Sequence, residues 1–181
     1  MKTLNIKSLL YVAFALLMSC NDSSSIEGAV KSLYGKRIKI DWDNEISITR
    51  TEGGLYETPY KIVAPFDEDS CTSCFLGHLD VCIDYCGKLP SDSVTYICIV
   101  PIDAEQIIST IKAEEIDLKG LHIISDVNDT YARDNRIDKY SSFFCTYLLD
   151  ANDRIIIVGD PIRKSSIRKL YNKKINKAAD E

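Results

Sequence analysis

The sequence lacks the common signatures of nucleotide-binding and hydrolytic enzymes. It has no glycine-rich phosphate loop and no Ser-His-Asp set in a recognisable local context, and histidine occurs only twice in 181 residues. Positive charge is not in excess either, because the formal net charge is −5 at pH 7. An acidic chain argues against a nucleic acid as the main partner. We therefore expect no P-loop chemistry, no serine-triad hydrolysis and no nucleic-acid binding.

Long hydrophobic runs are also missing, apart from one near the start of the chain. Leu9–Met18 is too short to span a bilayer comfortably and follows Lys2 and Lys7, so it is typical of the apolar region of a secretory signal peptide. The stretch that ends it, Leu17-Met18-Ser19-Cys20, resembles a bacterial lipobox, in which the cysteine becomes the lipidated first residue. An ordinary signal peptide or a retained membrane anchor is the alternative.

The length and this leader predict three parts. Residues 1–19 are expected to be a lipoprotein signal peptide, and residues 20–33 a lipid anchor and tether that is polar and serine-rich at 21–25. Residues 34–181 are expected to form one domain with an N-terminal strand extension. A domain of this size buries most of its apolar surface without cross-links, which excludes a disulfide-dense miniprotein.

Export would allow the cysteines to form disulfides, because the cell envelope permits disulfides that a cytosol would reduce. Setting Cys20 aside leaves six: Cys71, Cys74, Cys82, Cys86, Cys98 and Cys145. An even number could pair completely, although connectivity cannot be deduced from spacing. Their positions in predicted helices and strands argue against full pairing.

Two of these thiols, with two residues between them, lie where a strand pattern gives way to a helical pattern. The apolar, β-branched run at 60–66 predicts a strand, and a helical stripe of Phe75, Leu79, Cys82 and Cys86 follows. Cys71 and Cys74 therefore fall at a strand-to-helix junction, with Cys71 at a helix N-terminus. Unpaired backbone N–H groups and the helix dipole there lower the pKa of a thiol. The spacing fits redox chemistry or metal binding.

The remaining pattern predicts an α/β fold with a mixed central sheet flanked by helices. An edge strand at 34–40, a loop around Trp42 and a short strand at 46–50 are expected before the junction. Asp103 with Gln106 is typical of a capping box that starts a helix. Further strands are expected at 94–100, 121–124, 143–149 and 154–158, a hairpin turn at 150–153, a short surface helix within 126–136, and a basic amphipathic helix at 162–175 with Ile167, Leu170 and Tyr171 on one side.

This order of elements, with Cys-x-x-Cys opening the first core helix, resembles the thioredoxin-like superfamily, especially its lipid-anchored members related to TlpA and alkyl hydroperoxide reductase. Lys61 to Phe66 followed by Cys71-Thr72-Ser73-Cys74 is similar to the family's strand and redox motif. Thr146 to Ile155 is similar to its Thr-containing hairpin, and Gly35-Lys36 to its early Gly-Lys. The resemblance implies that Cys71 attacks a substrate disulfide and Cys74 resolves the mixed disulfide.

The sequence departs from the family at three places. Ser70 stands where members carry tryptophan, and Phe144 or Cys145 stands where they carry a cis-proline, so we expect a trans peptide and an altered substrate groove. Asp67, Glu68 and Asp69 are acidic and disfavour a thiolate, which predicts a reducing dithiol.

Other cysteines and histidines have alternative interpretations. Cys82, Cys86 and Cys98 are expected to pack in the core. Cys145 is a possible third thiol of the site or a buried strand cysteine. No metal site is expected from Cys71, Cys74, His78 and Cys82, because helical geometry scatters these ligands. His122 is expected to be packed, with a weaker possibility of ligating copper.

These patterns together predict a lipid-anchored thiol-disulfide oxidoreductase of the bacterial cell envelope, without a cofactor. Its expected partners are protein or small-molecule disulfides, an electron donor that the sequence does not identify, and the membrane through its lipid. A non-catalytic or copper-carrying thioredoxin-like lipoprotein is the alternative, and a peroxidase-like activity is a third possibility. The basic segment at 163–177 is expected to be a solvated helix face.

Overall fold

The computed structural model describes residues 21–46, 58–66, 72–137 and 146–179. The chain divides into two compact units, residues 1–33 and 34–181. In the first, helix α2 spans Asn21–Leu33. The role of residues 20–33 as lipid anchor and tether stays a prediction. Within the described ranges, no helix combines the length and hydropathy that crossing a membrane requires.

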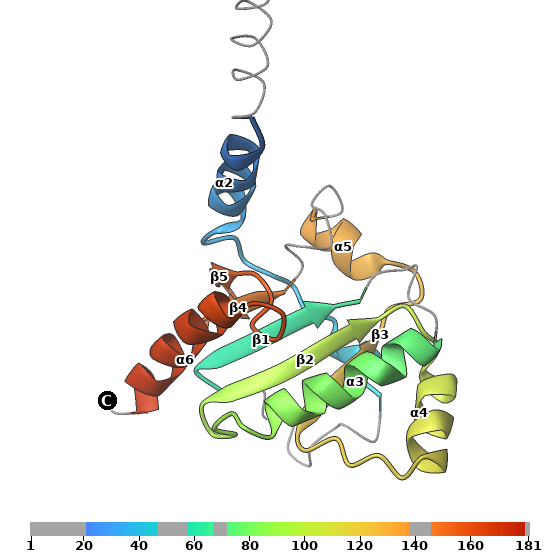
Figure 1. The fold of residues 1–181 in the computed structure, drawn as a ribbon. Helices are drawn as coiled ribbons and strands as arrows, with labels where there is room; N and C mark the ends of the chain where they lie inside the picture. Colours follow the sequence, from blue (N-terminus) through green and yellow to red (C-terminus); the bar gives the residue numbers. More distant parts are fainter. Residues whose placement is uncertain (1–20, 47–57, 67–71, 138–145, 180–181) are drawn as a thin grey trace, which may run out of the picture. The chain divides into compact units, whose positions relative to one another are not determined.

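The second unit alternates strands and helices as predicted (Figure 1). It contains η1 (Trp42–Asn44), β1 (Tyr60–Pro65), α3 (Thr72–Cys86), β2 (Val94–Val100), α4 (Ala104–Ala113), β3 (Leu121–Ser125), α5 (Thr130–Asn135), β4 (Tyr147–Leu149), β5 (Ile155–Val158) and α6 (Ser165–Ala179).

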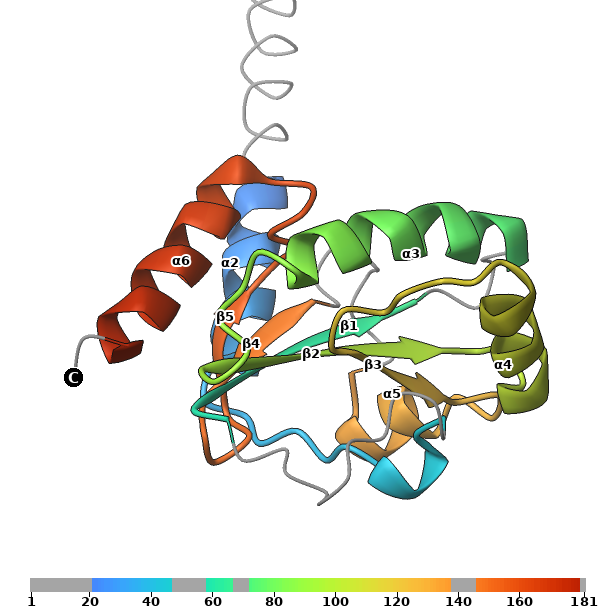
Figure 2. The same ribbon diagram turned by 90° about the horizontal axis from the view of Figure 1, so that it is seen from below.

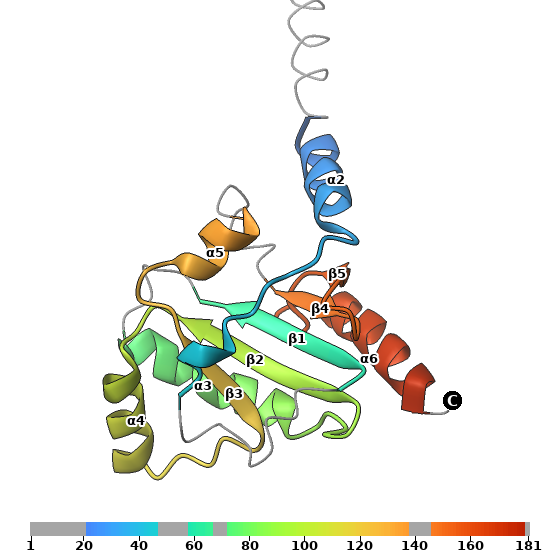
Figure 3. The same ribbon diagram turned by 180° about the vertical axis from the view of Figure 1, so that it is seen from behind.

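The five strands form one mixed sheet in the order β3-β2-β1-β4-β5 (Figure 3). Strands β1, β2 and β3 are parallel, with Val63 opposite Ile97 and Ile97 opposite His122. Strand β4 runs antiparallel to both β1 and β5. The predicted mixed central sheet is therefore confirmed.

Both faces of this sheet are covered, which explains the continuous apolar runs of its strands. Figure 2 shows α3 and α6 on one face and α5 with η1 on the other. All seven residues of β2 are buried. Alternate residues of β2, Tyr96, Cys98 and Val100, belong to the core cluster that also contains Leu79 of α3 and Tyr171 of α6.

Side-chain caps fix where several elements begin. Asp103 accepts hydrogen bonds from the backbone N–H groups of Glu105 and Gln106, which confirms the predicted start of α4. The final helix begins at Ser165, not at 162, because the carboxylate of Asp160 holds the backbone N–H groups of Ile162 and Arg163 in a turn.

Three expectations about faces and edges are wrong. Leu170 is 51% exposed, whereas Tyr171 and Ile175 of the same helix are buried in the core. Tyr131 is buried, so α5 is more than a surface helix. Residues 34–40 form a single antiparallel bridge, Arg37 to Arg154, and no strand. One bridge satisfies too few backbone groups to make a strand.

The expected loop around Trp42 contains a short 3-10 helix, η1, held by the Asp41 side chain. At the predicted strand 46–50, Ile46 donates its backbone N–H to Ile123, and residues 47–50 lie outside the described ranges.

Candidate functional site

The elements that flank the predicted redox motif lie where the sequence places them. Strand β1 ends at Pro65, and α3 begins at Thr72, so the segment between them joins a strand to a helix. Cys74 belongs to the first turn of α3. Cys20, Cys71 and Cys145 lie outside the described residues, so their predicted roles stay predictions.

An aromatic cluster anchors this junction. Phe66, directly after β1, packs edge-on against the rings of Phe75 and His78 of α3, with centroid distances of 5.3 and 5.0 Å. Edge-to-face contacts of this kind add to the free energy gained by burial. The carboxyl end of β1 is thereby fixed against the first two turns of α3.

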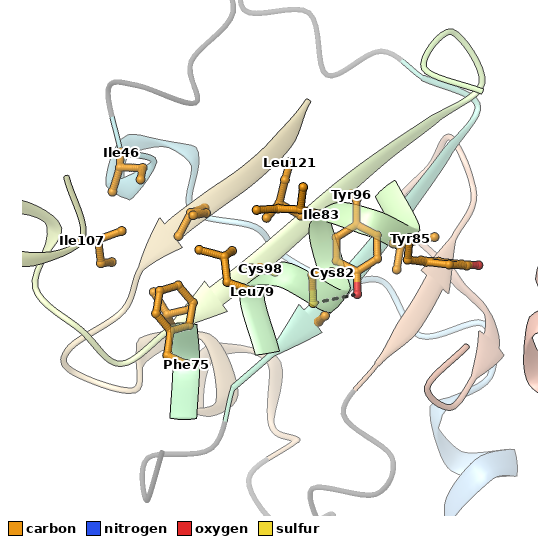
Figure 4. Packing of buried hydrophobic residues seen from close by; sticks show 14 of the residues in the cluster. Ile46, Phe75, Leu79, Cys82, Ile83, Tyr85, Tyr96, Cys98, Ile107 and Leu121 are labelled. Carbon is orange, nitrogen blue, oxygen red and sulfur yellow. Dashed lines mark hydrogen bonds between the residues drawn. The ribbon is translucent and has the colours of Figure 1, made fainter. Parts of the chain in front are cut away.

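Further along α3, a cluster of polarisable side chains lies between the helix and β2 (Figure 4). We call His78, Cys82, Tyr96 and Cys98 the thiol cluster. Cys82 and Cys98 are completely buried, and the Sγ of Cys82 lies 3.7 Å from the Tyr96 hydroxyl. The ionisation of Cys82 is also coupled to Cys98 and to His78. Burial confirms that Cys82 and Cys98 pack in the core, and Cys82 also has a polar contact there, with the Tyr96 hydroxyl.

These contacts change the ionisation of the cluster. The hydrogen bond from Cys98, followed by interactions with His78, outweighs burial and lowers the pKa of Cys82 to about 5. Its hydrogen bond with Cys82 raises the pKa of His78. Burial raises the pKa of Cys98 well above the ordinary value. The neighbours in the thiol cluster therefore lower the pKa of Cys82 and raise that of His78.

Cys86 differs from its neighbour one turn earlier. It is half-buried, and its thiol donates to the carbonyl oxygen of Lys119 at 3.6 Å. Burial raises its pKa to about 11, so the thiol is protonated and unreactive near neutral pH. Cys82, Cys86 and Cys98 are all free thiols. No group of three or more His, Cys, Asp or Glu side chains within the described ranges is arranged to hold a metal ion.

His122 is packed, as expected, and has an acidic partner that the sequence did not reveal. Its Nδ1 lies 2.7 Å from the Oε1 of Glu45, and both residues are buried. The ring of Trp42 meets the His122 ring edge-on at 6.5 Å. Glu45 gives no sequence signal, because a single acid in a loop resembles any solvated carboxylate.

A polar surface cavity of about 240 Å³ lies at the ends of two strands. Its walls come from η1, the start of α4 and the loop after β3; they include Asp43, Asp103, Asp126, Asn128 and Thr130. Because β1, β2 and β3 are parallel, the end of β1 that leads to the Cys-x-x-Cys faces the same edge of the sheet. Ligand contacts in open α/β sheets concentrate at this edge. No pattern in the sequence predicted this cavity.

Comparison with known proteins bears on the fold. No family model matches the chain, and no curated protein matches it. A domain of a possible thiol-disulfide isomerase from Cytophaga hutchinsonii matches 81% of this chain and 97% of its own length, with 20% identity and a TM-score of 0.53. A thioredoxin-like protein from Parabacteroides distasonis matches 72% of this chain and 89% of its own, with 12% identity and a TM-score of 0.47. Copper-bound yeast Sco1 matches 64% of this chain and 77% of its own length, with 12% identity and a TM-score of 0.42.

The chain has a thioredoxin-like fold. The mixed sheet, the helix that follows its central strand β1 and the likeness to the Cytophaga domain agree on this point. The resemblance stated from the sequence is thus confirmed for the fold.

Proposed function

We propose that this protein is a thiol-disulfide oxidoreductase, attached to the cell envelope through a lipid on Cys20, and that Cys71 and Cys74 carry the reaction. One observation supports the proposal above others. In a thioredoxin-like fold, the Cys-x-x-Cys of this sequence falls between the end of β1 and the first turn of α3. A helix N-terminus at that point supplies unpaired N–H groups that favour a thiolate.

The reaction is a two-step disulfide exchange. The Cys71 thiolate attacks one sulfur of a substrate disulfide, forms a mixed disulfide and releases the other substrate sulfur as a thiolate. The Cys74 thiolate then attacks the Cys71 sulfur, breaks the mixed disulfide and releases the second substrate thiolate. Two electrons pass from the Cys71–Cys74 pair to the substrate, and the pair becomes a disulfide. A reducing donor dithiol restores it.

Trapping of the mixed disulfide tests this mechanism. A Cys74→Ala chain incubated with an envelope extract should accumulate disulfide-linked adducts on Cys71, because the resolving thiol is missing. Adducts should disappear on reduction and should not form with Cys71→Ala/Cys74→Ala. Cys86→Ala serves as the matched control, since it removes a protonated thiol from the same helix and should leave exchange unchanged.

The opposite result has a definite meaning. A Cys74→Ala chain that captures no partner would contradict the oxidoreductase and favour the alternative, in which Cys71 and Cys74 form a static disulfide or bind copper. Cys145→Ala examines the third thiol: if Cys145 joins a disulfide switch, its removal should change the pattern of adducts.

Lipid attachment is tested separately. Globomycin should cause the unprocessed precursor to accumulate, and mass spectrometry of the mature N-terminus should find a lipid on Cys20. An unmodified N-terminus would contradict the anchor but leave the dithiol chemistry standing.

A further inference from the structure

The final helix, α6, presents a basic face to solvent. The helix carries five basic residues and no acidic one, although the whole chain has a formal net charge of −5 at pH 7. The exposed cations agree with the solvated face that the sequence predicts, and with the exposed Leu170 among them they are called the basic face below: Arg168, Lys169, Lys173 and Lys174.

Packing fixes which side of α6 faces outward. Tyr171 and Ile175 are buried, and the Tyr171 hydroxyl donates to the carbonyl oxygen of Gly159 at 3.0 Å. These two buried residues are four positions apart, so they lie on one side of the helix. Lys169 and Lys173 are also four apart and are turned by about 200° from that side, which places them opposite the core. The helix cannot turn these cations inward without withdrawing Tyr171 from the core.

The charge of the basic face is not neutralised inside the described part of the fold. An ion pair of 3.4 Å joins Arg163 to Asp160, but both residues precede α6. The four cations of the basic face form no ion pair with any residue that the structure describes. Like charges four positions apart, such as Lys169 and Lys173, destabilise a helix. A negatively charged surface outside the molecule would relieve this repulsion.

The composition of the basic face favours a lipid surface as the source of that negative charge. Leu170 is 51% exposed, and its neighbours three and four positions along the helix are Lys173 and Lys174. Three of the four cations are lysines, which bind phosphate as mobile point charges and need no fixed bidentate geometry. A bilayer offers many phosphates and an apolar layer beneath them for the leucine. A nucleic acid offers only the phosphates, and the acidic chain as a whole disfavours it.

We propose that the basic face of α6 docks on a membrane surface rich in anionic lipid headgroups, with Leu170 at the boundary of the acyl layer. The inference rests on the proposed attachment through Cys20 for its biological setting, because a tether raises the effective concentration of the domain at the bilayer. Each Lys or Arg close to an anionic surface strengthens binding about fivefold. The cations of one helix face are therefore enough to hold a tethered domain against the bilayer.

Docking through α6 would orient the domain. The C-terminal half of α6 lies beside the end of the sheet at which β1 and β2 begin (Figure 1 and Figure 3). The segment that carries the Cys-x-x-Cys follows the opposite end of β1 and leads into α3. A domain that rests on the basic face therefore turns the edge that leads to the proposed redox motif away from the bilayer, toward partners in solution.

Tryptophan fluorescence on vesicles tests the docking. Trp42 is the single tryptophan of the chain, so a full-length Trp42→Phe/Leu170→Trp chain carries one reporter, on the basic face. The chain is reconstituted with vesicles of phosphatidylcholine, or of an equimolar mixture with phosphatidylglycerol, and brominated phosphatidylcholine serves as the quencher in both. Quenching should be strong on the anionic vesicles and near background on the neutral ones. It should decrease in 1 M salt, where the Debye length is about 3 Å.

Charge variants on this reporter chain locate the contact. Lys169→Gln/Lys173→Gln/Lys174→Gln removes three cations and should lower the equilibrium constant for docking about 100-fold. Glutamine is a good helix former and these positions are exposed, so the fold should be retained, which circular dichroism checks. The matched control removes three exposed cations from outside α6 and should leave the quenching unchanged: Lys39→Gln/Lys112→Gln/Lys119→Gln.

The results have distinct consequences. Equal quenching on neutral and anionic vesicles overturns the inference, as does quenching that survives in the α6 variant or falls equally in the control. A short DNA duplex that releases the reporter at the same phosphate concentration would assign the face to nucleic acid and also overturn it. Docking combined with no trapped adducts in Cys74→Ala retains the membrane contact and removes the oxidoreductase. Trapped adducts without docking do the reverse.

Discussion

Glu45 and His122, 77 positions apart in sequence, are joined by a hydrogen bond of 2.7 Å beneath the sheet. His122 is the second residue of β3, and Glu45 directly follows η1, so the bond attaches the segment before β1 to an edge strand. An isolated bridge between Glu45 and Ile124 continues the attachment through the backbone. Glu45 also lines the polar cavity, so its bond to His122 holds part of the cavity wall in place.

Replacing Glu45 should destabilise the domain. Glu45→Ala removes a hydrogen-bond partner of a buried imidazole, and a buried polar group that loses a partner costs about 1–3 kcal/mol. Urea unfolding should show that loss in the free energy of unfolding. Glu105→Ala, which removes an exposed acid from α4, should change the value by about 0.5 kcal/mol or less. Equal effects of the two substitutions would contradict a structural role for Glu45.

In a second long-range pair, Lys61 and Asp153, loss of either charge should cost a different amount of stability. The ammonium of Lys61 on β1 is only 8% exposed and lies 2.8 Å from the carboxylate of Asp153, which is 29% exposed. Asp153→Asn leaves the buried charge without its counter-ion and should cost about 1–3 kcal/mol, less than a fully buried pair because water reaches Asp153. Asparagine also tolerates the positive φ of 59° at this turn, so strain does not confuse the result.

The matched variant for this pair is Lys61→Met, which removes the charge and keeps the long stem. It should cost less than Asp153→Asn, and the double variant should cost less than the sum of the two. Strict additivity in urea unfolding would mean that the two side chains are not coupled.

Local features of the fold could be predicted because their causes are local. The apolar runs of β1 and β2 predicted strands, and the structure buries all of β2. The turn chemistry at 150–153 was equally informative, since the Asp150 carboxylate accepts the backbone N–H groups of Asn152 and Arg154 at 2.9 Å each.

Contacts between residues that are distant in the sequence could not be predicted, because they depend on how the elements pack. Periodicity placed Cys82 on the buried face of a helix, but the position of Cys98 opposite it depends on how α3 lies on β2. Leu170 was wrongly placed on the same side of its helix as Tyr171, because neighbouring residues at 170 and 171 point in directions about 100° apart and only one can face the sheet. The partner of His122 likewise depends on the path of the chain before β1.

High pH should lower the free energy of unfolding of the domain. Burial raises the pKa of Cys86 to about 11 and that of Tyr85 to about 12. The folded state therefore keeps these protons at pH values where the unfolded chain loses them. Their contribution to stability is complete below the ordinary pKa of each group and is lost as pH rises toward 11 and 12.

Thermal or urea unfolding between pH 8 and 11, with a reductant present, checks this sign. Stability should fall as pH rises, and Cys86→Ala should flatten the slope between pH 9 and 11, because one linked proton is removed. Rising stability over this interval, or a slope unaffected by Cys86→Ala, would contradict burial as the cause.

The redox potential of the Cys71–Cys74 pair should be reducing and should respond to the acids that precede it. Asp67, Glu68 and Asp69 disfavour a thiolate, which destabilises the reduced form relative to a helix N-terminus without acids. Replacing the three by Asn, Gln and Asn should raise the potential by roughly 10–30 mV, equivalent to about 0.5–1.4 kcal/mol for exposed charges screened by salt. Equilibration in glutathione buffers measures the potential, and the increase should shrink at high salt.

The control neutralises another acidic trio, beyond the end of α4, and should leave the potential unchanged: Glu114, Glu115 and Asp117. A wild-type potential near −120 mV, as oxidising as that of DsbA, would contradict the electrostatic argument, because the acids would then fail to offset the helix N-terminus.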